Sequence, residues 1–168
     1  MTRTGLFIKV NNRHRLIVYD VLQKRAIDLM DGRNYLFAGD TDLSADDFIR
    51  NFHSKPSRVL HRIEPTDSIV SFYQNDKLVV FRNKKIFVID STLNFKPLVT
   101  KLSLDLLIVS NKSKLYFKKL AETFDIKLVV FDGSVPAWKM KYWKNDCNSL
   151  QIPYYDVIEK GAFVMNLN

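Results

Sequence analysis

The sequence is poor in the residues on which most catalytic and covalent scaffolds depend. Its 168 residues include one cysteine, three histidines and five glycines. Because Cys147 has no second thiol to pair with, an internal disulfide is excluded, and with it the disulfide-stapled class of small domains. The glycines are dispersed, so they form no phosphate-cradling loop, and there is no Gly-x-Ser-x-Gly nucleophile elbow.

The three histidines do not form a metal-binding pattern. His14, His53 and His61 are not spaced one, two or four residues apart. A zinc site needs three or four His, Cys or carboxylate ligands that converge on one point. We therefore expect no metal and no cofactor. The adjacent Asp46 and Asp47 fall at an expected helix start, where we interpret them as capping charges rather than an acid–base pair.

Long apolar runs are also missing. No segment approaches the ~20 apolar residues that cross a bilayer as a helix, and no apolar stretch follows Met1-Thr2-Arg3-Thr4 as in a secretory signal. At 168 residues the chain suits one domain with a core of its own. We therefore expect a single soluble domain spanning residues 1–168, whose start close to a strand is typical of a domain excised from a longer protein.

Aromatic and basic residues are plentiful instead. The chain has 12 Phe, 7 Tyr and 2 Trp, and its formal net charge is +8. Aromatic and β-branched side chains fit a pleated, half-buried surface, so we expect much sheet. The positive charge favours contact with phosphates or anionic lipid, and it serves solubility equally well. Composition leaves these two interpretations open.

Hydrophobic periodicity predicts a run of strands followed by alternating strands and helices. The expected strands are 5–10, 14–21, 26–30, 35–38, 68–73, 77–82, 85–90, 104–110, 127–131, 154–158 and 162–167, and the expected helices are 45–52, 113–124 and 136–148. The turn Asp31-Gly32-Arg33-Asn34 predicts a hairpin, because glycine accepts positive φ. The order indicates an α/β layered fold, a β-meander plus alternating β-α-β units.

The last third of the chain holds the best candidates for a binding site. The candidate nucleic-acid-binding residues are Lys112, Lys114, Lys118, Lys119, Lys139, Lys141, Lys144 and Trp138. Lysines on the solvent faces of two helices would neutralise phosphates, and Trp138 would stack on exposed bases. Alternatively, the lysines only solvate the helices, while Trp138 and Trp143 anchor the last helix on the sheet. We favour this second interpretation for the tryptophans, because large aromatics dominate core burial.

Several motifs together resemble one known family. A buried strand leads into Asp132-Gly133-Ser134, followed by Pro136-Ala137-Trp138, Trp143 and, near the end, Gly161-Ala162-Phe163-Val164. Upstream stand Ala26-Ile27-Asp28 and Asn51-Phe52-His53-Ser54-Lys55-Pro56-Ser57-Arg58. Over nearly the whole chain, these residues resemble the C-terminal end of the ComEC-type competence (DNA-uptake) proteins of Bacteroidetes.

The resemblance implies a truncated, degenerate metallo-β-lactamase-like layered fold. Residues 18–27 are similar to the opening strand, but Leu22 and Lys24-Arg25 replace the family's glycines and acid. Residues 106–113 are similar to a strand that ends in His-His-Gly-Ser, with Asn111 and Lys112 in place of the histidines. The family's His-x-His-x-Asp-His motif is absent, and so is the later Gly-His-Pro.

These departures imply that the domain is not an enzyme. The degenerate metal-site positions are Asp90, which is similar to a metal-bridging aspartate, Asn111 and Lys112. Asn and Lys in place of two histidines remove imidazole ligands and bring a cation to the metal's position. Lys112 and Lys114 would then make this pocket attractive to anions.

The expected function is that of a non-catalytic C-terminal domain of a ComEC-like protein. It would assist DNA translocation by non-specific nucleic-acid binding or by docking on the channel. Single-stranded DNA and the membrane channel portion of the parent protein are the expected partners. The expected location is a soluble domain of an inner-membrane protein, with the periplasmic side favoured. Two alternatives are a protein-interaction module with an apolar functional surface and a cryptic metal-dependent hydrolase.

Overall fold

The computed structural model of the protein describes residues 14–40, 64–65, 72–75, 77–91, 99–110 and 114–167, with the backbone alone at 64–65 and 72–75. The expected strand 5–10, the expected helix 45–52 and most of the expected strand 68–73 lie outside these residues. So do Asp46, Asp47, His53 and His61.

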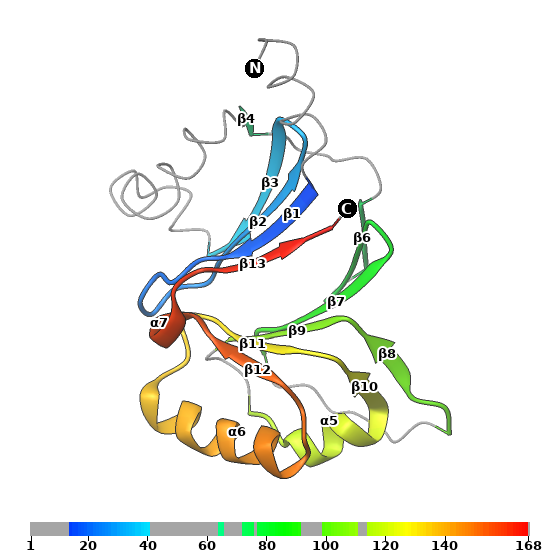
Figure 1. Cartoon of the computed structure of the whole chain (residues 1–168), viewed down its shortest axis with the longest axis vertical. Coiled ribbons are helices and arrows are strands. Elements are labelled where there is room, and N and C mark those ends of the chain that lie inside the picture. The colour runs from blue at the N-terminus through cyan, green and yellow to red at the C-terminus, as the bar shows by residue number, and fades with distance from the viewer. Residues whose placement is uncertain are drawn as a thin grey trace, which may run out of the picture.

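Two large sheets, a small two-stranded sheet and a layer of helices make up the described part of the chain (Figure 1). The five-stranded sheet has the order β13 (Phe163–Asn166), β1 (His14–Val18), β2 (Ala26–Asp31), β3 (Asn34–Gly39) and β4 (Glu64–Pro65). The six-stranded sheet has the order β12 (Tyr154–Asp156), β11 (Val129–Phe131), β9 (Leu106–Val109), β7 (Lys84–Ile89), β6 (Leu78–Phe81) and β5 (Phe72–Asn75). A two-stranded sheet joins β8 (Leu102–Leu104) and β10 (Phe124–Ile126), and the helices are α5 (Phe117–Thr123), α6 (Ala137–Ser149) and α7 (Val157–Lys160).

The five-stranded sheet contains the predicted hairpin. Strands β2 and β3 pair antiparallel, with Asp31 opposite Asn34 at the turn. Gly32 has φ 64°, a conformation that costs glycine little and other residues more. Strand β13 pairs antiparallel with β1, so the end of the chain completes a sheet begun near its start.

The six-stranded sheet combines the two predicted patterns. Strands β5, β6 and β7 form an antiparallel meander, and β7, β9, β11 and β12 are parallel to one another. Helix α5 lies in the connection from β9 to β11, and α6 lies in the connection from β11 to β12. Because parallel strands are covered on both faces, all four residues of β9 are buried, as its continuous apolar run predicted.

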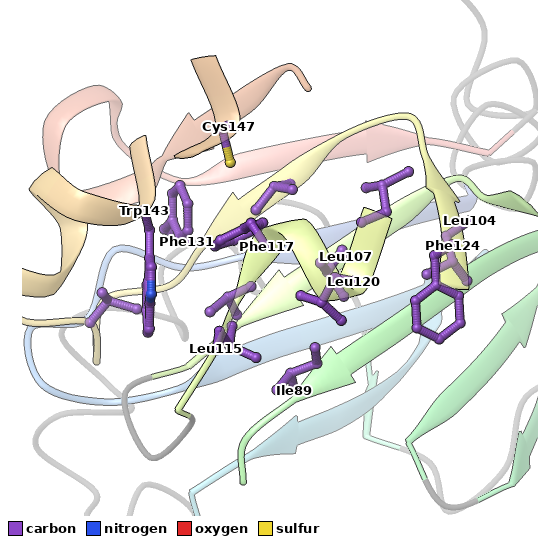
Figure 2. Packing of buried hydrophobic residues seen from close by; sticks show 14 of the residues in the cluster. Ile89, Leu104, Leu107, Leu115, Phe117, Leu120, Phe124, Phe131, Trp143 and Cys147 are labelled. Carbon is purple, nitrogen blue, oxygen red and sulfur yellow. The ribbon is translucent and has the colours of Figure 1, made fainter. Parts of the chain in front are cut away.

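Two cores hold the three layers together. Between the sheets, Val18 and Leu29 lie in one cluster with Phe81 and Ile108. Between the six-stranded sheet and the helices, Phe117 packs against Phe131 and Trp143 (Figure 2). The Trp143 ring stacks on that of Phe131, with centroids 6.1 Å apart and an interplanar angle of 15°. This packing explains why α6 lies flat on the sheet.

Several predicted boundaries need correction. The expected strand 14–21 ends at Val18, and the expected strand 104–110 is divided between β8 and β9. The expected helix 113–124 is shorter: α5 begins only at Phe117, and Phe124 leaves it to begin β10 and pairs in parallel with Leu102 of β8. The expected strand 154–158 ends at Asp156. The Asp156 carboxylate accepts hydrogen bonds from the backbone N–H groups of Ile158 and Glu159, and so caps the short helix α7.

The architecture is therefore α/β with strands in the larger share, which confirms the predicted class. Metallo-β-lactamase-like layering stays a prediction. Within the described ranges, no helix has the length and apolar character required to cross a membrane.

Candidate nucleic-acid interface

Helix α6 presents aromatic rings to solvent. Trp138 and Tyr142 are each 64% exposed, although both are large hydrophobic side chains. They are four residues apart, and the exposed Lys141 stands three residues after Trp138, so all three share one side of the helix. We call Trp138, Lys141 and Tyr142 the aromatic ridge. Figure 1 shows that α6 covers the face of the six-stranded sheet that is turned away from the five-stranded sheet.

The two tryptophans have opposite roles. Trp143 is 6% exposed and packs in the core, so the anchoring interpretation is confirmed for this residue. For Trp138 it is wrong, because a spacing of five residues turns the two side chains to different faces of a helix with 3.6 residues per turn. The Lys139 ammonium lies 5.5 Å from the ring centroid of Trp138 and 5.6 Å from that of Trp143. These cation–π contacts tie Trp138 to the protein.

Helix α5 adds further positive charge beside α6. Lys118 and Lys119 are exposed on α5, and Lys114 is exposed just before it. The Lys119 ammonium is 5.6 Å from the ring centroid of Tyr116, which is 69% exposed. Since α5 and α6 cover the same sheet face, the candidate residues that the structure describes lie on or just before one layer of the molecule, and Lys112 lies outside the described residues.

Lys144 does not belong with the exposed lysines. Its ammonium pairs with the carboxylates of Asp156, at 2.8 Å, and Glu159, at 2.7 Å. Burial opposes its charge, but the hydrogen bonds to these two carboxylates raise the pKa of Lys144 above its usual value. The charge of Lys144 is therefore already compensated within the fold, and its predicted role as a phosphate ligand stays a prediction.

The carboxyl ends of the parallel strands carry a second polar cluster. Asp90 follows β7, and its carboxylate accepts hydrogen bonds from Arg25 Nη1, at 2.6 Å, and from Lys77 Nζ. Burial raises the pKa of Asp90, but the hydrogen bonds from Lys77 and Arg25 outweigh it and hold the pKa below its ordinary value. Two cations thus compensate the charge of Asp90, and its predicted match to a metal-bridging aspartate stays a prediction.

Asp132 follows β11 and is fully buried. Its carboxylate accepts hydrogen bonds from the Ser110 hydroxyl, the Ser134 hydroxyl and the Ser134 backbone N–H. Burial nevertheless raises the pKa of Asp132 to about 6, although these hydrogen bonds and the charge of Arg25 act in the opposite direction. The hydrogen bond from Ser110 to Asp132 joins the ends of the neighbouring strands β9 and β11.

The described residues of this cluster do not fit a metal ion. Asp90 already neutralises two cations, and the Asp132 carboxylate already accepts hydrogen bonds from the hydroxyl groups of Ser110 and Ser134. Across the described ranges, no three His, Cys, Asp or Glu residues gather in a way that could hold a metal. Asn111 and Lys112 lie outside the described residues, so their predicted place in a degenerate site stays a prediction.

Cys147 is not a reactive thiol in this fold. Its side chain is fully buried on the core-facing side of α6 (Figure 2). Burial, with a smaller contribution from the charge of Asp146, raises the pKa of the Cys147 thiol to about 12. A thiol with that pKa is protonated at neutral pH and is a poor nucleophile.

A groove of about 850 Å³ opens beside the start of α6. We call it the α6 groove, and its lining includes Leu22, Val135, Pro136, Met140, Lys141 and Ile158. One wall is built by a close approach of two loops. The Gln23 N–H donates to the Gly133 carbonyl at 2.7 Å, and a Cβ on Gly133 would lie 2.0 Å from the Val21 carbonyl oxygen. The sequence analysis did not predict this groove, although Gly133, Ser134 and Pro136, which line it, stand together in the sequence.

Comparison with known families decides the identity of the chain. Residues 16–167 match the family described as the ComEC C-terminal domain. The chain belongs to this family. The match confirms the predicted family. ComEC proteins are membrane-associated proteins of competence and DNA uptake. The Bacteroidetes assignment stays a prediction. No curated protein and no solved structure matches the chain.

Proposed function

We propose that this ComEC C-terminal domain is a non-catalytic module that assists DNA uptake by binding single-stranded DNA without sequence preference. The observation that carries the proposal is the aromatic ridge, in which Trp138 and Tyr142 are exposed on either side of Lys141. Aromatic platforms flanked by cations bind single strands because every base has a π-face and every nucleotide has a phosphate.

The cost of keeping these rings in solvent supports the proposal. Burial of a Trp or Tyr side chain is worth several times the thermal energy, yet both rings on the ridge stay outside the core. Lys139 holds the Trp138 ring, so that less side-chain freedom is lost when a base stacks on it. Lys118 and Lys119 on α5 would extend the phosphate contacts beyond the ridge.

The non-catalytic part of the proposal rests on the strand ends. In a degenerate metallo-β-lactamase-like domain, Arg25 and Lys77 would take the place of metal charge opposite Asp90. The domain would face the periplasm and dock on the membrane channel portion of its parent, where it meets the incoming strand. Stoichiometric zinc or manganese in the purified protein would contradict this part.

Fluorescence anisotropy with a labelled oligo-dT tests the DNA-binding part. We expect Trp138→Ala to weaken binding about 5- to 100-fold, because one stacked base is worth about 1–3 kcal/mol. Trp138→Phe, which keeps a π-face, should retain most of the affinity. If the Ala and Phe variants both bind as tightly as the wild-type protein, the ridge is not the binding surface and the proposal is wrong.

A further inference from the structure

The α6 groove lies where layered α/β folds commonly place ligands. Its floor is formed by the turn after β11 and by Asp156 at the end of β12, two parallel strands of the six-stranded sheet. Crevices outside the carboxyl ends of such strands are the usual ligand sites of open α/β sheets. At about 850 Å³, the groove also falls in the size range of sites that enclose small ligands.

The walls of the α6 groove are apolar and partly exposed. Leu22 is 68% exposed and Ile158 is 45% exposed, and both line the groove with Pro136 and Met140. At the lip, Gln23 has φ 61°, an uncommon backbone conformation for a residue other than glycine. Its side-chain amide offers both a donor and an acceptor to a polar edge within the groove.

The two lysines that line the groove differ in exposure and in charge compensation. Lys141 lines the groove and also belongs to the aromatic ridge, so it joins the two surfaces. Inside, Lys144 is neutralised by Asp156 and Glu159. A phosphate is therefore favoured at Lys141, whereas the interior suits an uncharged group with apolar faces and a polar edge. A nucleobase has that chemistry.

We infer that the α6 groove receives one unpaired nucleobase of a bound single strand, with the adjoining phosphate at Lys141. The groove and the aromatic ridge then form one continuous path along α6. This inference rests on the proposed function, since it assigns the same strand a second contact.

A matched pair of charge variants tests the inference. Ile158 and Val164 are 45% and 46% exposed, but only Ile158 lines the groove. Ile158→Glu and Val164→Glu change the net charge equally, so their difference reports the groove itself. We expect Ile158→Glu to weaken oligo-dT binding about fivefold more than Val164→Glu at the same salt concentration. With an oligonucleotide of abasic sites, the two variants should bind alike.

A second pair of variants keeps the test valid if Ile158→Glu fails to fold. Leu22→Glu alters the opposite wall of the groove, and Leu102→Glu alters an exposed leucine on β8, which is 52% exposed and outside the groove. The same difference in affinity is expected between these two variants, and thermal unfolding followed by circular dichroism checks that each is folded.

The outcomes separate this inference from the proposed function. If the groove variants bind oligo-dT like their controls while Trp138→Ala weakens binding, the inference is overturned and the proposed function stands. The inference is also overturned if the groove variants lose only a protein contact with the channel portion, because the groove is then a docking site. If Trp138→Ala has no effect either, the proposed function itself fails.

Discussion

At the scale of single residues, the carboxyl groups of Asp132 and Asp90, which follow parallel strands, differ in their surroundings. Asp132 accepts hydrogen bonds from two serines, yet its complete burial raises its pKa to about 6. Asp90 follows β7, which is separated from β11 by β9. Burial raises the pKa of Asp90, but the hydrogen bonds from Lys77 and Arg25 outweigh it and lower the pKa below its ordinary value. The pKa values of two carboxyl groups that follow parallel strands therefore shift in opposite directions, because one gains cations and the other mainly loses water.

The pKa of Asp132 predicts a pH-dependent stability. An exposed aspartate has a pKa of about 3.9, so the folded protein with its pKa of about 6 binds this proton more tightly than the unfolded chain. The resulting stabilisation is complete below about pH 4 and is lost as the pH rises through 6. We expect Asp132→Asn, which cannot ionise, to increase the free energy of unfolding at pH 8 by up to about 3 kcal/mol relative to the wild-type protein.

Urea denaturation at several pH values between 4 and 8 measures this difference. It should shrink towards pH 4, where the wild-type carboxyl is protonated as well. Asp105→Asn is the control of opposite sign. Burial raises the pKa of Asp105, but the hydrogen bonds from Lys127 and the Lys85 N–H outweigh it and hold the pKa below its usual value. Replacing the Asp105 carboxylate should therefore lower the free energy of unfolding at neutral pH. A difference between Asp132→Asn and wild type that is independent of pH would contradict the prediction.

At the scale of elements, α6 divides its side chains between the core and the solvent. Its buried residues are Met140, Trp143 and Cys147. They face the core, where Trp143 packs against Phe117 and Phe131. Trp138 and Tyr142 occupy the opposite, exposed side. The helix can therefore carry a binding surface that contributes little to the stability of the fold.

Two tryptophan variants test this division. Trp143→Ala should lower the free energy of unfolding by about 3–5 kcal/mol, because it leaves a cavity beside Phe117 and Phe131. Trp138→Ala should lower it by less than about 1 kcal/mol, because that ring mainly loses its contact with Lys139. Urea denaturation measures both values. Equal losses would show that the ridge is part of the structural core.

At the scale of the whole molecule, the three layers separate structure from binding. The five-stranded sheet packs on one face of the six-stranded sheet, and α5 and α6 cover the other (Figure 1). The exposed lysines of the proposed interface all belong to this helical layer or precede it. The helical layer therefore offers a polyanion several exposed lysines on one side of the molecule.

The salt dependence of DNA binding tests this arrangement. Each phosphate contact on a single strand contributes about −0.7 to the slope of log K against log salt concentration. We expect Lys141→Gln to reduce the slope by about that amount. Lys127 is 61% exposed and pairs with Asp105, away from the ridge, so Lys127→Gln should leave the slope unchanged. Equal slopes for the two variants would contradict a phosphate contact at Lys141.

Local patterns in the sequence determined the elements of the fold. The Asp31–Asn34 turn, the apolar run of β9 and the helical spacing after Pro136 all depend on neighbouring residues, and each appears in the structure. The family also followed from local motifs, among them Asp132-Gly133-Ser134 and the residues after it.

Tertiary structure alone decided which of these residues are available for function. Arg25 reaches Asp90 across 65 positions of sequence, and Lys144 is neutralised by Asp156 at the end of β12 and Glu159 in α7. Likewise, only the packing of α6 on the sheet distinguishes Trp138 from Trp143. The physical reason is that burial and charge compensation depend on partners far away in the chain, whereas turns and helices depend on residues close by.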